Sequence, residues 1–105
     1  KLTYTFLVVD FDGTNQPQRP ASLYGIPRVY LVPQDRLVEC ENLARQAGDE
    51  FLRNGEWNFI RWFSGRFREL LNLNGITYRY VGHIGLSYVE RQNDYLADSI
   101  ARVVI

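Results

Sequence analysis

The sequence predicts an α+β fold, with a mostly antiparallel sheet of three to four strands and with a helix hairpin and a C-terminal helix packed on one face. The first observation is that the hydrophobic period changes from 2 in the first ten residues to about 3.6 after Asp35. The second is the order of elements, which lacks the strict strand–helix alternation of a doubly wound sheet. The 105 residues, 46% of them apolar, suit a single domain over residues 1–105 with one core and no need of a metal or disulfide.

Two strands are expected before the helices. In residues 2–11 one alternating set is apolar from Leu2 to Val8, and the other turns from threonine to apolar residues near the end, which predicts a central strand covered in part on both faces. Residues 28–32 form a second strand between Pro27 and Pro33. Because proline limits strand pairing, we expect this strand at a sheet edge.

Two helices follow, each with one apolar face. Asp35 can cap the first, whose stripe ends before Asn54-Gly55. The second runs over residues 56–73 and stops at Asn74-Gly75. The short link between them predicts an antiparallel hairpin. The expected core positions are Leu37, Cys40, Ala44, Ala47 and Phe51 on the first helix and Ile60, Phe63, Phe67, Leu70 and Leu71 on the second.

The last thirty residues return to strand-like composition. Residues 76–89 are rich in tyrosine, valine and isoleucine, and Gly82-His83 in their middle fits a two-residue hairpin turn or a bulge in one bent strand. We favour the hairpin. Residues 94–104 carry apolar side chains at helical spacing and are predicted as a helix, although residues 102–105 fit an extended chain equally well.

Composition excludes several classes of chemistry. Twelve basic and twelve acidic residues cancel, which argues against a general nucleic-acid coat protein. The only lysine is Lys1, which speaks against phosphate-loop nucleotide binding and Schiff-base catalysis. One histidine, His83, and one cysteine, Cys40, exclude zinc clusters, and we expect no cofactor. With no intrachain disulfide possible and no run of 18 apolar residues, we expect a cytoplasmic protein without a membrane partner.

The strongest candidate for a binding surface lies on the helix predicted over residues 56–73. The ridge beside the core-facing residues holds Trp57, Arg61, Ser64 and Arg68 at i, i+4, i+7 and i+11, and Trp62 lies on the opposite flank. Arg79 extends this surface if its strand lies alongside. Tryptophan with arginine is typical of protein-binding hot spots, and it also suits base stacking with phosphate contacts. The alternative is that the tryptophans widen the packed face while the arginines stay solvated.

Charge is divided unevenly between the two helices. Residues 35–50 have a local net charge of −3, and residues 53–79 one of +3. This complementarity can hold the hairpin together, or it can pair two copies of the chain.

Residues 8–14 read Val-Val-Asp-Phe-Asp-Gly-Thr. This segment resembles the first motif of the haloacid dehalogenase-like phosphohydrolases. The resemblance implies that Asp10 is a nucleophile and Asp12 a proton donor. Asp94 and Asp98, at i and i+4, could help to hold magnesium. The other interpretation is that Asp-Gly starts a turn at a strand end.

The sequence therefore favours a small non-catalytic protein-interaction or regulatory module that uses the aromatic-arginine surface, with residues 13–26 as a second contact region. The expected partner is a protein or a second copy of the chain. The alternatives are an RNA or single-stranded DNA binding protein, and a magnesium-dependent phosphohydrolase using Asp10 and Asp12. We expect alanine at Trp57 and Arg61 to weaken partner binding without unfolding the domain.

Overall fold

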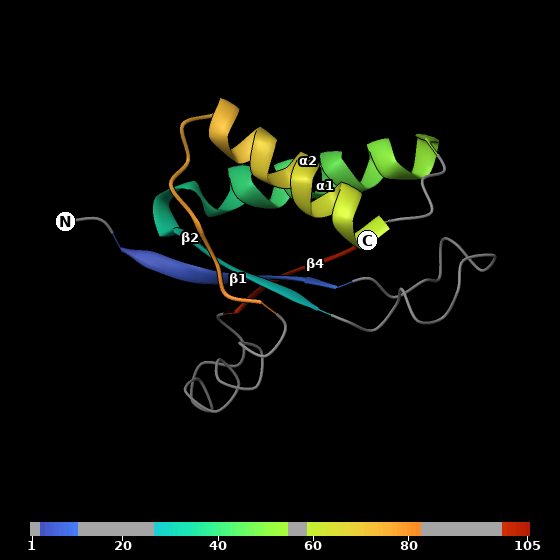
Figure 1. The fold of residues 1–105 in the computed structure, drawn as a ribbon. Helices are drawn as coiled ribbons and strands as arrows, with labels where there is room; N and C mark the ends of the chain where they lie inside the picture. Colours follow the sequence, from blue (N-terminus) through green and yellow to red (C-terminus); the bar gives the residue numbers. More distant parts are fainter. Residues whose placement is uncertain (1–2, 11–26, 55–58, 83–99) are drawn as a thin grey trace.

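A pair of helices covers one face of a four-stranded sheet (Figure 1). The computed structural model describes residues 3–10, 27–54, 59–82 and 100–105, and at residues 51, 52, 54 and 59–62 it describes the backbone alone. In chain order the elements are β1 (Tyr4–Asp10), β2 (Arg28–Pro33), the 3₁₀ turn η2 (Gln34–Arg36), α1 (Leu37–Asn54), α2 (Phe59–Leu73), β3 (Arg79–Tyr80) and β4 (Ala101–Val104). The α+β fold is confirmed.

The sheet has the strand order β3-β2-β1-β4 and mixed direction. Strand β2 pairs antiparallel with β1 and with β3, whereas β1 and β4 run parallel. The central place predicted for the first strand is confirmed. The edge position predicted for β2 is wrong, because Pro27 precedes the strand and Pro33 ends it, so the residues between keep their N–H groups for two ladders.

The C-terminal residues are a strand, and the helix predicted over residues 94–104 is wrong for its last four residues. Leu7 pairs with Ala101 and Asp10 with Val104, and the Ile105 N–H donates to the Asp10 carbonyl at 2.8 Å. Val103 is buried, whereas its neighbours Arg102 and Val104 are exposed, and this alternation of burial is typical of a strand. The β-branched residues at this end favour a strand, and pairing with β1 decides between the two periods. Residues 94–99 lie outside the described ranges.

The main core lies between the sheet and the helices. Phe63 and Phe67, predicted to face inward, are fully buried, and so are Cys40, Ala44 and Ala47 on α1. From the sheet, the core takes Leu7, Val9, Tyr30, Val32 and Val103. On the opposite face a smaller cluster holds Val8 and Val29, with Phe6, Val81 and Ile100 against it. The predicted coverage of β1 on both faces is therefore confirmed.

The start of the first helix differs from the expectation. Asp35 lies inside the turn η2, so it does not occupy the N-cap position of that turn. The N-cap residue is Pro33, which makes no side-chain hydrogen bond to the turn. The Asp35 carboxylate still sits in the first turn, where the helix dipole favours negative charge. Arg36 donates to the Glu39 carboxylate at 2.9 Å across this turn.

The end of the second helix is as predicted. Asn74 and Ile76 donate backbone N–H groups to the carbonyls of Leu70 and Leu71, at 3.1 and 2.9 Å. Gly75 has φ +66°, a left-handed conformation that residues with a Cβ rarely adopt. The two helices then run antiparallel side by side (Figure 1).

After Gly75 the chain runs back past α2 and pairs with β2 only over Arg79 and Tyr80. The predicted choice between a hairpin and a bulge at Gly82-His83 falls mostly on residues 83–89, which lie outside the described ranges. No helix in the described ranges is long and apolar enough to span a membrane.

Candidate functional site

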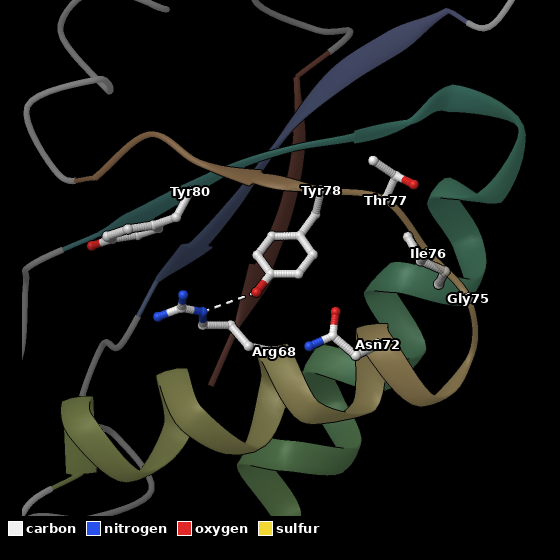
Figure 2. A pocket seen from close by; sticks show the side chains of 7 residues that line it. All are labelled: Arg68, Asn72, Gly75, Ile76, Thr77, Tyr78 and Tyr80. Atoms are coloured by element: carbon white, nitrogen blue, oxygen red, sulfur yellow. Dashed lines mark hydrogen bonds between the residues drawn. The ribbon is translucent and has the colours of Figure 1, made fainter.

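An open groove lies between the C-terminal half of α2 and the chain that leads into β3 (Figure 2). Its volume is about 700 Å³, and it is lined by Arg68, Asn72, Gly75, Ile76, Thr77, Tyr78 and Tyr80. Next to the groove, a smaller hollow of about 500 Å³ shares Arg68, Asn72 and Tyr78 with it and adds Gly65, Glu69 and Leu73.

The groove exists because the turn at Gly75 sends residues 76–80 back along the helix. Ile76 is buried and anchors this return. Tyr78 and Tyr80 then face the helices, since Tyr78 packs on the main core and the Tyr80 ring lies 5.1 Å from the ring of Tyr30. Strand alternation places the Arg79 side chain on the other face of the sheet.

Arg68 is the cation of the groove. Its Nε donates to the Tyr78 hydroxyl at 2.9 Å (Figure 2), and this bond raises the pKa of Arg68 above its ordinary value. In the described part of the chain no carboxylate forms an ion pair with Arg68. Its guanidinium is exposed and keeps donors for a further acceptor.

Arg66, two residues earlier, behaves differently. Its Nε lies 2.6 Å from a Glu50 carboxylate oxygen on α1, and its Nη1 lies 2.7 Å from Glu69. Part of the predicted charge complementarity between the helices is thus satisfied within the molecule. Arg68 has no such partner in the described ranges, which leaves its charge available for binding.

Beside Arg68 lies a buried tyrosine whose hydroxyl faces that of Ser64 without a hydrogen bond of ordinary geometry. Tyr30 is fully buried, with its ring 4.9 Å from that of Phe67, and its hydroxyl has no partner in hydrogen-bonding geometry among the described residues. Burial raises the pKa of Tyr30 to about 12, while the nearby Ser64 hydroxyl and the charges of Arg28 and Arg68 act in the opposite direction.

Arg28 adds a second unsatisfied group at the same place. It precedes Tyr30 by two residues on β2, so both side chains lie on the helix side of the sheet. The Arg28 Nε is buried and finds no acceptor in the described part of the chain. Native proteins rarely leave buried polar atoms unpaired, and two of them on neighbouring side chains require a physical reason.

The predicted site residues are only partly described. Arg68 lies in the groove, while Arg61 and Trp62 belong to α2 with side chains outside the described set, and Trp57 lies outside the described ranges altogether. Arg79 is exposed but points away from Arg68.

Arg28 and Tyr30 are candidate site residues that the sequence did not predict. Their i, i+2 spacing on a strand was the available signal, but only the packing of α2 on the sheet, with Phe67 against Tyr30, brings Tyr30 near Arg68.

The alternative site at the end of β1 has a different character. The Asp10 carboxylate forms an ion pair with Arg102 on β4, which ties the two parallel strands together. Asp12, Asp94 and Asp98 lie outside the described ranges. Within those ranges no three histidine, cysteine, aspartate or glutamate side chains gather in a way that could hold a metal.

The single cysteine is buried in the main core, as predicted. Burial raises the pKa of the Cys40 thiol to about 11, and the neighbouring Glu39 carboxylate adds to this shift. The thiol is therefore kept in its neutral, unreactive form. His83 lies outside the described ranges.

Comparison with known proteins adds no identity to this geometry. No protein-family model, curated protein or solved structure matches the chain.

Proposed function

We propose that this domain is a small non-catalytic binding module, and that an extended segment of a partner protein binds in the groove beside α2. The observation that carries the proposal is the grouping of an arginine free of ion pairs with two tyrosines at the edge of the described sheet. Arginine and tyrosine, together with tryptophan, are enriched among the side chains that supply most of the binding energy at protein interfaces.

The backbone of β3 supports an extended partner. The Val81 N–H donates to the Val29 carbonyl at 2.8 Å, so residues 79 and 81 direct their backbone groups towards β2. In an antiparallel ladder this alternation turns the N–H and C=O of Tyr80 away from β2. A segment that adds to this side gains main-chain hydrogen bonds, while the groove receives its side chains.

The observations favour a protein over a nucleic acid. The Tyr78 hydroxyl is held by Arg68, and the Tyr80 ring leans on Tyr30 with an interplanar angle of 46°, so neither ring stands free as a stacking platform.

The test is selection of peptides with the whole chain. A displayed library of random peptides, each long enough to span the groove, is enriched on the protein, and synthetic copies of the enriched sequences are titrated into ¹⁵N-labelled protein by NMR. We expect shifts at Asn72, Thr77, Tyr78 and Tyr80, and a loss of affinity of about tenfold in Arg68→Gln. Arg45→Gln is the matched control, because Arg45 lies on α1 and is exposed.

Two results would contradict the proposal. One is a library that yields no binder; the other is binders that shift residues elsewhere and are unaffected by Arg68→Gln. Oligo-uridine and oligo-thymidine are titrated in parallel. If they shift the same residues, with affinity falling steeply with salt, the partner is a nucleic acid instead.

A further inference from the structure

The unsatisfied buried groups next to the groove point to a more specific chemistry. Arg28 and Tyr30 lie on β2 and Arg68 lies on α2, and the charges of both arginines act on the Tyr30 hydroxyl. Ser64 precedes Arg68 by four residues, which is one helical turn, and it lies beside the Tyr30 hydroxyl. The cluster therefore combines two guanidinium groups with two hydroxyl groups.

The cluster carries positive charge without a described counter-charge. Neither Arg28 nor Arg68 forms an ion pair among the described residues, although Arg36, Arg45, Arg66 and Arg102 all do. Both unsatisfied side-chain atoms here, Arg28 Nε and the Tyr30 hydroxyl oxygen, can donate a hydrogen bond. A set of donors with net positive charge is matched by an acceptor with negative charge.

The cost of leaving these donors unpaired supports the same conclusion. An unsatisfied buried donor forgoes the hydrogen bonds that water supplied in the unfolded chain. A phenylalanine at position 30 would fill the same space without this cost, and the domain nevertheless carries the hydroxyl. A bound oxyanion accepts hydrogen bonds from several donors at once and removes the penalty.

We propose that Arg28 and Arg68 bind an oxyanion, a carboxylate or a phosphate group, next to the Tyr30 hydroxyl and the ring of Tyr80. The inference rests on the proposed function, because the partner segment carries this group; Arg68 lines the groove, and Tyr30 borders it through the ring of Tyr80. Tyr30 and Ser64 act as neutral donors, and the two arginines supply the charge.

The test measures the anion alone, without any peptide. Sodium phosphate and sodium acetate are titrated separately into ¹⁵N-labelled full chain, with sodium chloride added to hold the ionic strength constant. We expect saturable shifts of the Arg28 and Arg68 Nε–Hε signals and of the Ser64 and Tyr80 amides. The anion that binds more tightly indicates which group of the partner is recognised, because acetate represents an acidic side chain and phosphate represents a phosphorylated one.

Variants separate this site from general attraction of anions. Arg28→Gln and Arg68→Gln should each weaken binding by about tenfold or more, and Arg79→Gln, on the opposite face of β3, should not change it. Tyr30→Phe should weaken binding severalfold while raising the Tm measured without anion. That combination cannot come from a misfolded variant.

The inference is overturned if the shifts do not saturate, if Arg79→Gln weakens binding as much as Arg28→Gln, or if a crystal structure shows a water molecule held by both donors at saturating phosphate. Its failure is distinct from failure of the proposed function. If the anion binds but the library yields no peptide, the proposal of a partner segment is wrong and the anion site stands. If peptides bind, and neither Arg28→Gln nor added phosphate weakens their binding, the anion site is wrong and the proposed function stands.

Discussion

Tyr30 combines full burial in the core with a hydroxyl group that no described residue satisfies. Its ring packs against Phe67 and Tyr80, so the aromatic part stabilises the fold, while the hydroxyl opposes it. Removing only the oxygen separates the two contributions.

We expect Tyr30→Phe to raise the free energy of unfolding by about 1 kcal/mol. An unpaired buried hydroxyl costs about 1–3 kcal/mol, and the small cavity left by the missing oxygen offsets part of the gain. Urea denaturation in a buffer without phosphate or carboxylate measures it. Tyr78→Phe is the control, since its hydroxyl accepts from Arg68 and its loss should not stabilise the protein. A destabilised Tyr30→Phe variant would show that the hydroxyl is satisfied.

The same residue sets an alkaline limit of stability. Burial raises the pKa of Tyr30 from 10.0 to about 12. Above pH 10 the unfolded chain loses the phenolic proton while the folded chain keeps it, so the stability from the neutral form is present below pH 10 and is lost between pH 10 and about 12. Unfolding curves measured at about pH 9 and about pH 11, on either side of the unfolded pKa, should differ less in Tyr30→Phe than in the parent protein.

Cys40 gives a second prediction at this scale. The thiol is fully buried with a pKa of about 11, so iodoacetamide at about pH 8 should modify it only through unfolding. The rate, followed by mass spectrometry, should rise on addition of urea in parallel with the unfolded fraction. Rapid modification of the native protein would contradict the burial.

Burial at single positions was largely predictable from the sequence, because helical period alone identifies Phe63, Phe67 and Cys40 as inward-facing. The candidate site was not. Arg28 and Tyr30 acquire meaning only from Ser64 and Arg68, which lie far along the chain on another element, and local pattern carries no information on such a pairing.

At the scale of elements, an ion pair of suitable geometry joins the two helices of the hairpin. Arg66 meets Glu50 through two nitrogens, at 2.6 and 3.1 Å, and both side chains are partly buried. The opposite net charges of the two predicted helices indicated this attraction, although not the residues that form it.

We expect Glu50→Gln to lower the free energy of unfolding by about 0.5–1 kcal/mol. Arg66 holds the pKa of Glu50 below its ordinary value of 4.5, so this stability is present above pH 4.5 and is lost as the pH falls through the folded pKa. The difference between variant and parent should shrink at about pH 3 and in high salt. Glu41→Gln, whose contact with Arg45 is 3.7 Å, should change stability less.

Two glycines within helices form a matched pair. Gly65 on α2 is exposed, and a methyl group added there would meet no heavy atom within 4 Å, so Gly65→Ala should stabilise by about 0.5–1 kcal/mol through helix propensity. A Cβ on Gly48 of α1 would lie 2.7 Å from Ile105 Cγ2, so Gly48→Ala should destabilise. Thermal unfolding of both variants measures the contrast. Equal gains in Tm would mean that Ile105 moves aside without cost.

Element types followed from the sequence where the period was long, as in both helices. The C-terminal segment was predicted as a helix because Ile100 and Val103 are three residues apart, which fits a helical spacing. In the structure Val103 packs in the main core under the helices, and Ile100 packs in the smaller cluster on the opposite face of the sheet. For a segment of only four residues, the strand that lies next to it determines whether it is a helix or a strand, and the sequence does not show which strand that is.

For the whole molecule, the fold class was predictable and the strand order was not. Composition and element order indicate α+β, but the insertion of β1 between β2 and β4 depends on contacts between the two ends of the chain. Such distant pairings form late and slow folding, because chain entropy opposes them until the rest of the sheet exists.

The parallel pairing of β1 with β4 determines how the molecule resists a pulling force. The start of β1 and the end of β4 lie at opposite ends of their shared ladder, whose pairs run from Leu7 with Ala101 to Asp10 with Val104. Tension applied through the two ends of the chain therefore loads these hydrogen bonds together in shear, whereas a hairpin opens one bond at a time. In single-molecule stretching, unfolding through residues 1 and 105 should need a higher force than unfolding through residues 10 and 28, which peels β1 from β2. Equal forces in the two geometries would mean that the terminal pair is not the mechanical clamp of this domain.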